Sequence, residues 1–493
     1  MSKRVRDPDA PEEAAGLKSG ERPPSAPGNG PDDMDFEDEY EDEFESEDEV
    51  MEAGVDGRPD AEREAEEQDA MEVDQDTFIP GRNKLSPGET LAPDLSAYDM
   101  LHQISTTWPC LSIDVVRDNL GDNRRTYPAT VYAVAGTQAE RSREKENQLM
   151  VLKLSGLSKM EKEAEESDDE DDDDETTEPV METKSIPLTS CTNRIRAHQA
   201  QQEGEGFPTT LAASMMESGQ VLIFDVTPHL QSFDSPGSVL SPTQSKPACT
   251  IRAHKSVEGF ALDWSPLIPE GKLLTGDISG KIFTTTRTAG GGFVTDTTPY
   301  TGHEGTVEEL QWSPSERTVF ASASNDKTIK IWDARSKTRR SVLSVQASGT
   351  DVNVLSWSHQ TAHLLASGAD DGVWAVWDLR AWKPLAGGAS SRPLPVASFS
   401  FHKEQITCVE WHPTDDSIVL VAAGDNTLTL WDLAVELDDE ESRFTAGVQD
   451  VPPQLLFVHY MDQVKEGHWH PQIPGAVVAT GGAGFGVFKT ISV

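Results

Sequence analysis

Cysteine and long apolar runs are both scarce in this chain, and each absence limits what the protein can be. The four cysteines stand at 110, 191, 249 and 408 and form no C-x-x-C pair. We therefore expect a reducing compartment, with neither a disulfide framework nor a zinc site. Apolar runs such as Ile418–Ala423 have the length of a strand and are too short to cross a membrane.

Basic residues are also in short supply. The chain holds 41 Lys and Arg against 86 Asp and Glu, a net charge of -45. This balance argues against direct nucleic-acid binding and favours a basic partner. Residues 1–80 carry 7 basic and 29 acidic residues, and 161–178 carry 13 acidic residues against Lys162. Such blocks bury too little apolar surface to offset chain entropy, so a disordered acidic tail (1–80) and a disordered acidic insert (156–184) are predicted.

Two short stretches of the tail have possible roles. Asp32–Glu49 carries Phe36, Tyr40 and Phe44 at four-residue spacing. That spacing suits a short helix formed on a basic partner, or else the stretch simply solvates the chain. Residues 3–6 (Lys-Arg-Val-Arg) are a candidate for nuclear import or an ordinary charged terminus.

Catalytic motifs are missing as well. The sequence has no G-x-S-x-G elbow and no P-loop. His459, His468 and His470 lie close in sequence, yet no cysteine stands near them, so structural roles are expected rather than a metal site. We assign no catalytic residue, cofactor or metal.

A repeat takes the place of such motifs. Three times an aspartate precedes a Trp-Asp pair by six residues: Asp326 before Trp332, Asp371 before Trp377 and Asp425 before Trp431. A second series of tryptophans stands at 264, 312, 357, 411 and 469. A structural unit is thus copied about every 50 residues, which is the signature of a repeat architecture.

Each unit reads as four short strands. Between 303 and 333, β-prone runs alternate with turn residues, which predicts a propeller blade. We expect a buried polar chain through His303, Ser322, Asp326 and Trp332. Because Ser367, Asp371 and Trp377 recur in the next unit without a histidine, these residues are interpreted as scaffold rather than as a catalytic set. The fold class is all-β, a seven-bladed propeller over residues 108–493.

The last unit is one strand short, and the sequence offers a strand to complete it. Trp108–Val115 alternates like a half-buried strand and is expected to close the ring. Before it, Leu91, Leu95, Tyr98, Leu101 and Ile104 recur at helical spacing. An amphipathic helix is therefore predicted in the N-terminal segment, 81–107.

Two Trp-Asp-x-Arg tetrapeptides end at Arg335 and Arg380. They match a box of WD-repeat substrate receptors of cullin-RING ubiquitin ligases, which makes both arginines candidates for binding a ligase adaptor. The simpler interpretation is that each arginine pairs with its own aspartate at the end of a blade.

The predicted helix and the acidic Pro-Pro loop (434–454), with its Pro452-Pro453-x-Leu-Leu-Phe, resemble the histone-binding WD-repeat family. The acidic tail and insert make residues 30–493 most similar to its glutamate-rich subgroup. The resemblance implies a non-enzymatic, nuclear and nucleolar chaperone that takes newly made large-subunit ribosomal protein L-three, with capture in the cytoplasm possible, to early pre-ribosomal particles. A histone chaperone and a ligase receptor are the alternatives.

Two surfaces are candidates for binding the basic client. One is a groove between the helix and the loop, and the other is the face of the ring on which the blades begin. Ser46 and Ser167 precede acidic residues, so they are either kinase sites or merely serines in acidic runs. We expect a monomer. The candidate residues are Leu95, Tyr98, Leu101, Asp438, Asp439, Glu440 and Glu441 in the groove, and Glu258, Glu308, Asp351 and Glu404 on the face.

Overall fold

The computed structural model describes residues 93–160, 178–200, 207–235, 237–383, 392–435 and 451–493. The described residues belong to one compact unit, Thr90–Val493. The predicted acidic tail, residues 161–177 of the insert and residues 436–450 of the acidic loop lie outside the described residues.

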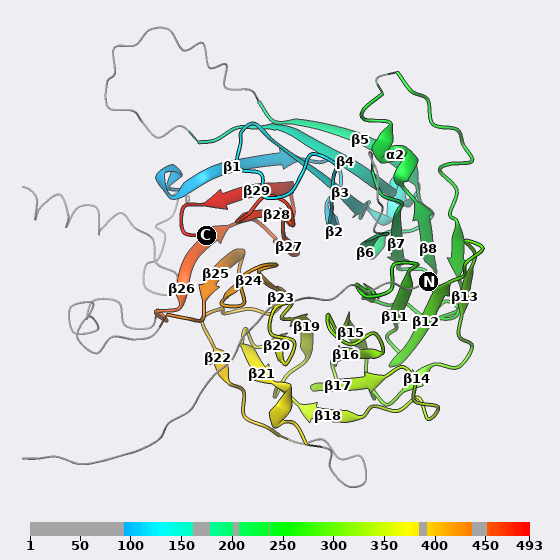
Figure 1. Ribbon diagram of the computed structural model, residues 1–493, viewed down its shortest axis with the longest axis vertical. Coiled ribbons are helices and arrows are strands. Elements are labelled where there is room, and N and C mark those ends of the chain that lie inside the picture. Colours follow the sequence, from blue (N-terminus) through cyan, green and yellow to red (C-terminus); the bar gives the residue numbers. More distant parts are fainter. Residues whose placement is uncertain (1–92, 161–177, 201–206, 236, 384–391, 436–450) are drawn as a thin grey trace, which may run out of the picture. The chain divides into compact units, whose positions relative to one another are not determined.

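Seven antiparallel sheets stand around a central axis as the blades of a propeller (Figure 1). Blade 1 is β2 (Cys110–Val116), β3 (Ala129–Thr137), β4 (Gln148–Leu157) and β5 (Val180–Pro187), and blade 2 is β6 (Thr192–Gln199), β7 (Thr210–Met216), β8 (Val221–Asp225) and β9 (Cys249–Ile251). Blade 3 is β10 (Ala261–Trp264), β11 (Lys272–Gly276), β12 (Lys281–Arg287) and β13 (Phe293–Thr295) with β14 (Tyr300–Thr301), and blade 4 is β15 (Val307–Trp312), β16 (Val319–Ser324), β17 (Thr328–Asp333) and β18 (Leu343–Gln346). Blade 5 is β19 (Val352–Trp357), β20 (Leu364–Ala369), β21 (Trp374–Asp378) and β22 (Ala397–Phe399), and blade 6 is β23 (Ile406–Trp411), β24 (Ile418–Ala423), β25 (Thr427–Asp432) and β26 (Leu455–Tyr460). Blade 7 is β27 (Glu466–Trp469), β28 (Ala476–Thr480), β29 (Gly484–Thr490) and β1 (Tyr98–Ser105).

Helices are minor in the described part of the chain. One α-helix, α2 (Thr227–Gln231), and three 3-10 turns, η1 (Leu95–Ala97), η2 (Arg141–Glu146) and η3 (Leu379–Ala381), interrupt the strands. None of the helices in these ranges is long and apolar enough to cross a membrane.

The sequence repeat corresponds to fixed places in the blade. Each tryptophan of the second series is the last residue of an innermost strand. Seven buried apolar clusters lie between neighbouring blades of the described unit, one for each boundary. A blade therefore buries both of its faces only when a neighbour stands on each side, which is why the ring must close.

The predicted polar chain of blade 4 is confirmed. His303 Nδ1 lies 2.8 Å from Asp326 Oδ2, and His303 Nε2 lies 2.6 Å from Ser322 Oγ. Trp332 Nε1 donates to Ser322 Oγ at 2.8 Å. In blade 5 Trp377 makes the same bond to Ser367 without a histidine. These residues pair with one another to satisfy buried polar groups, as a scaffold does.

The predicted N-terminal helix is wrong. Residues 98–105 form the strand β1, which pairs antiparallel with β29 from Tyr98 opposite Thr490 to Ser105 opposite Gly484. Tyr98, Met100 and Ile104 are buried, so the segment also has a two-residue period that the helical spacing masked. The open edge of β29 offers unpaired backbone groups, and pairing with them outweighs local helical preference.

The predicted closing strand is wrong for the same reason. Cys110–Val116 is β2, the innermost strand of blade 1, and it pairs with β3 from Cys110 opposite Thr137 to Val116 opposite Tyr132. Closure of blade 7 is made by β1 instead, so the propeller begins at Tyr98 rather than at residue 108.

Candidate functional site

The first strand is joined to the outer strand of blade 6 through a buried aromatic cluster. Tyr98 is 4% exposed, and its ring packs edge-on against Phe457 at 5.1 Å between centroids. The Tyr98 hydroxyl lies 2.8 Å from His459 Nδ1. Burial lowers the pKa of His459 to about 4, so the imidazole is neutral at pH 7 and accepts a hydrogen bond from the hydroxyl. Tyr98 therefore supports this region from beneath and is not itself an exposed binding residue.

Apolar side chains surround this cluster at the surface. Leu101 and Phe457 are half-buried against it, while Leu95 is 50% exposed. The 3-10 turn that presents Leu95 begins at Asp94, whose carboxylate accepts from Ser96 N at 3.0 Å. We call this surface the β1–β26 seam and define it as Leu95, Ala97, Leu101, Met160, Leu456 and Phe457.

The ends of three acidic segments lie next to this seam. The N-terminal segment enters the described chain at Pro93, just before η1. The insert leaves after Met160, whose backbone N–H donates to Asp99 O at 2.8 Å. The acidic loop leaves after Val435, whose carbonyl accepts from Gln454 Nε2 at 3.0 Å. Segments far apart in the sequence are thus attached close to β1 or β26.

The four predicted carboxylates at the blade starts have different surroundings. Glu258 Oε1 accepts from Asn193 Nδ2 at 2.8 Å, and Glu404 is exposed. Burial raises the pKa of Glu308 to about 7. The Arg194 guanidinium opposes that rise, and the carboxylate of Asp351 adds to it. Glu308 and Asp351 are therefore near neighbours, and together they make this mouth of the ring acidic.

Inside the ring lies a charged network that the sequence analysis did not predict. Glu466 Oε1 accepts from Arg194 Nη1 at 2.6 Å, and Glu466 Oε2 accepts from Ser112 Oγ at 2.8 Å and Ile113 N at 3.0 Å. Arg194 also reaches Glu309 at 3.1 Å. One glutamate of blade 7 is thus bound to blades 1 and 2, and the arginine extends the contact to blade 4.

A histidine completes this network. His468 Nδ1 lies 2.5 Å from Glu410 Oε2, and His468 Nε2 lies 3.4 Å from Glu466 Oε2. Burial lowers the pKa of His468, but Glu410 and Glu466 outweigh burial and raise it well above its usual value. Although burial opposes them, Arg196 and Arg194 hold the pKa of Glu466 well below its usual range. The histidine is therefore cationic at neutral pH and shares the buried charge.

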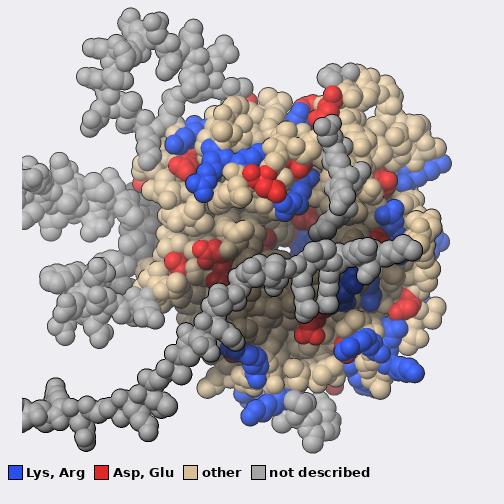
Figure 2. All heavy atoms as spheres, in the orientation of Figure 1, with Lys and Arg blue, Asp and Glu red and all other residues tan. Residues whose placement is uncertain are grey.

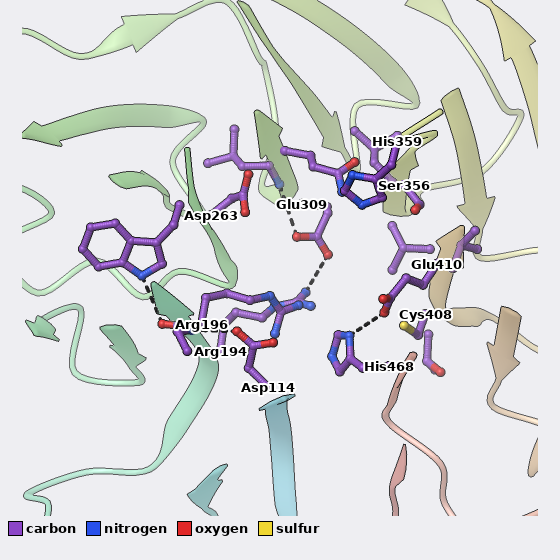
Figure 3. A pocket seen from close by; sticks show the side chains of 18 residues that line it. Asp114, Arg194, Arg196, Asp263, Glu309, Ser356, His359, Cys408, Glu410 and His468 are labelled. Atoms are coloured by element: carbon purple, nitrogen blue, oxygen red, sulfur yellow. Dashed lines mark hydrogen bonds and ion pairs between the residues drawn. The ribbon is translucent and has the colours of Figure 1, made fainter. Parts of the chain in front are cut away.

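These side chains line a cavity of about 220 Å³ in the channel (Figure 3). Figure 2 shows the matching hollow at the centre of the molecule. Burial raises the pKa of Asp263, another lining residue, to about 8. A signal in the sequence was available, because each tryptophan of the second series follows a polar residue: Asp263, Gln311, Ser356, Glu410 and His468.

The two candidate ligase-adaptor arginines pair locally. Arg335 Nη2 lies 2.7 Å from Asp333 Oδ2, and Arg380 Nη2 lies 2.7 Å from Asp378 Oδ2. Their side chains remain 72% and 68% exposed. This is the pairing at a blade end that the simpler interpretation predicts.

The three neighbouring histidines go to separate places. His459 bonds Tyr98, His468 belongs to the channel, and His470 Nδ1 accepts from the backbone of Gln472 and Ile473. Several predicted residues lie outside the described ranges, namely Asp438, Asp439, Glu440, Glu441, Ser46 and Ser167.

Comparison with known proteins places the chain. Residues 88–158 match the family of the histone-binding protein RBBP4, which is also described as a component of the CAF1 complex, and residues 270–443 match the propeller of the nucleolar protein 10-like N-terminal domain. The first match contains β1 and Met160 lies just beyond it, so it covers half of the seam's strands.

Full-length relatives are similar over most of their length. Ribosome assembly protein rrb1 of Schizosaccharomyces pombe is 47% identical over 442 residues, 89% of each chain. Protein HEAT STRESS TOLERANT DWD 1 of Arabidopsis thaliana is 37% identical and covers 87% of this chain and 94% of its own. Glutamate-rich WD repeat-containing protein 1 of Dictyostelium discoideum is 38% identical over 83% of this chain and 84% of its own. The chain therefore belongs to the glutamate-rich WD-repeat family that includes the ribosome assembly protein rrb1.

Proposed function

We propose that this chain is a non-enzymatic ribosome-assembly factor of the nucleus and nucleolus. In this role it binds newly made large-subunit ribosomal protein L-three and hands it to early pre-ribosomal particles. The name of the relative rrb1 supports the assembly role, and the family resemblance supplies the client.

The observation that carries the proposal is the attachment of three acidic segments beside one apolar seam. Residues 161–178 have a net charge of -12, and 436–450 hold six acidic residues against Arg443. A ribosomal protein without its RNA exposes basic extensions that aggregate or bind nucleic acid nonspecifically. Acidic segments screen that charge, while a fixed apolar surface supplies the selectivity that screening lacks.

The exposed and half-buried side chains of the seam suit a helix with one apolar face. Leu95, Leu101 and Leu456 come from different elements and offer apolar contact without a charged residue among the six that define the seam. An amphipathic basic helix would lay its apolar stripe there and direct its charged face toward the acidic segments.

The proposal is tested by the affinity for purified L-three over a series of salt concentrations. Replacing Leu101 with Asp should weaken binding at every salt concentration, because it places a charge in the apolar contact. Deleting 161–177 should instead weaken binding mainly at low salt and flatten the salt dependence. Leu394→Asp, at a side chain 89% exposed on blade 5, is the matched control and should bind normally. Unchanged affinity and salt dependence in both seam variants would contradict the proposal.

Histones are a second candidate client, favoured by the match of residues 88–158 to a histone-binding family. If both clients use the seam, a histone should compete with L-three, and Leu101→Asp should weaken both. Preference for the histone at moderate salt would move this function to first place.

A further inference from the structure

One region of this acidic protein is basic. The turn between β17 and β18 holds four Lys or Arg residues between positions 335 and 340. Figure 2 shows Lys and Arg side chains gathered over the region of β14 and β17. The basic patch is defined by Lys272, Arg317, Arg335, Lys337, Arg339 and Arg340, and Asp296, Glu316 and Asp333 are the acidic residues among them.

Contacts hold the patch together across blades 3 and 4. Arg339 Nη2 lies 2.9 Å from Asp296 Oδ2, and its guanidinium lies 4.5 Å from the centroid of the Tyr300 ring. Lys272 Nζ lies 4.9 Å from the centroid of Trp312. Burial lowers the pKa of Lys272, and Arg339 adds to that decrease while Asp296 opposes it. The two cations are therefore close, and one carboxylate serves both.

The patch has more donors than acceptors. Among the described residues, Trp312 Nε1 and Arg339 Nη1 are buried without a hydrogen-bond acceptor. Lys337 and Arg340 are exposed. With six cationic and three acidic side chains, the surface fits a partner that is rich in carboxylate or phosphate oxygens.

We propose that the patch docks the acidic stretch 32–49 of the same chain. This stretch has 13 acidic residues and no basic residue among its 18 positions. Attachment to the same chain gives it an effective concentration on the order of millimolar. A separate nucleic acid has no such advantage and meets the repulsion of a chain whose net charge is -45.

The linker is long enough for this contact. The roughly 44 residues from Glu49 to Pro93 span at most about 150 Å when extended. A compact unit of about 400 residues has a radius of gyration of about 22 Å. The stretch therefore reaches either face of the propeller from its attachment beside the seam.

Docking of the tail makes it a competitor within the molecule. While the tail covers the patch, the patch is closed to other polyanions. A basic client that takes up the tail releases the patch, so client capture and opening of the patch are coupled. The proposal holds whichever basic protein is the client.

The test is carbodiimide cross-linking of the full chain at low salt, with peptides of the cross-linked monomer mapped by mass spectrometry. Lys337 should join carboxylates of 32–49, and the cross-link should disappear at 0.5 M salt, where screening acts within roughly 4–5 Å. Arg340→Glu should reduce its yield roughly tenfold, because it replaces an attraction with a repulsion beside Lys337. Arg125→Glu, at an exposed arginine of blade 1, is the matched control and should leave the yield unchanged. Cross-links spread equally over exposed lysines such as Lys255 and Lys403 would overturn the proposal.

Binding of a single-stranded RNA oligonucleotide separates the other occupant. The full chain should bind it at least tenfold more weakly than a chain lacking 1–80, whose removal leaves the described propeller complete. The gain should be lost in the shortened chain carrying Lys337→Glu and Arg340→Glu. Equal RNA binding by the full and shortened chains would show that the tail does not cover the patch and would refute the docking.

Discussion

The Tyr98 hydroxyl donates a hydrogen bond to Nδ1 of His459 across 2.8 Å, and this bond joins the first strand of the chain to the outer strand of blade 6. The two residues are 361 positions apart, and both are buried. The bond ties the closing strand of blade 7 to its neighbour at the place where the acidic segments are attached. The integrity of the seam therefore depends on a contact that only ring closure creates.

Replacing Tyr98 with Phe should lower the free energy of unfolding by about 1–2 kcal/mol, because His459 Nδ1 then remains buried without its donor. Denaturant unfolding at pH 7 measures the loss. Leu95→Ala, at an exposed side chain of the same surface, should change stability by less than about 0.5 kcal/mol. Equal effects of the two substitutions would contradict the role given to the hydroxyl.

Stability should fall as the pH is lowered from about 6.5 toward 4, because the folded state holds His459 neutral. Its pKa is lowered to about 4, so the unfolded chain binds more protons in this window. His459 alone should cost about 2 kcal/mol between pH 7 and pH 5. His470, with a pKa lowered to about 3, acts in the same direction, whereas His468, with a raised pKa, opposes it.

His459→Asn isolates this effect. The side-chain oxygen of Asn can accept from Tyr98 and does not titrate, so the variant should lose about 2 kcal/mol less than the parent chain over the same pH interval. Denaturant unfolding at pH 7 and pH 5 compares the two. An identical pH dependence would show that His459 is not the responsible group.

Glu466→Gln should destabilise the ring by about 3 kcal/mol, since it leaves Arg194 and Arg196 buried without their common carboxylate. Thermal and denaturant unfolding both report the loss. Glu146→Gln breaks a surface ion pair with Arg143 and should cost less than about 1 kcal/mol. A loss no larger than that of the control would mean that the channel network contributes little to closure.

Glu308→Gln should have the opposite sign at high pH. The pKa of Glu308 is raised to about 7, so the folded state loses stability as the pH rises from about 4.5 through 7 and this carboxyl ionises. The amide cannot ionise, and after allowance for solvent screening the variant should gain about 1–2 kcal/mol at pH 8 and nothing at pH 5. A gain of equal size at both pH values would contradict this cause.

Local sequence patterns were enough to predict the blades. The Trp332 and Trp377 pairs mark third strands, and the tryptophan series marks the ends of innermost strands. The polar chain through His303 followed from the same spacing and is confirmed. Such features depend on residues within about 30 positions of one another, so periodicity alone reveals them.

Features that arise only from closure were missed. Arg194 and Glu466 are 272 positions apart, and nothing in either neighbourhood indicates the ion pair. The segment around Leu101 has helical spacing and becomes a strand because the edge of β29 is open to it. Tyr98 was expected to contact a partner and instead packs against Phe457 beneath the surface.

Hydrogen–deuterium exchange of the full chain with and without purified L-three tests the central claim most directly. The account predicts slower exchange in peptides covering 93–105 and 451–460, the two sides of the seam, and in the acidic segments attached beside it. Leu101→Asp should abolish that protection, while Leu394→Asp should keep it. Protection confined to the loops around Glu308 and Asp351 at the blade starts, with no change in β1 or β26, would contradict the account and place the client on the acidic mouth of the ring.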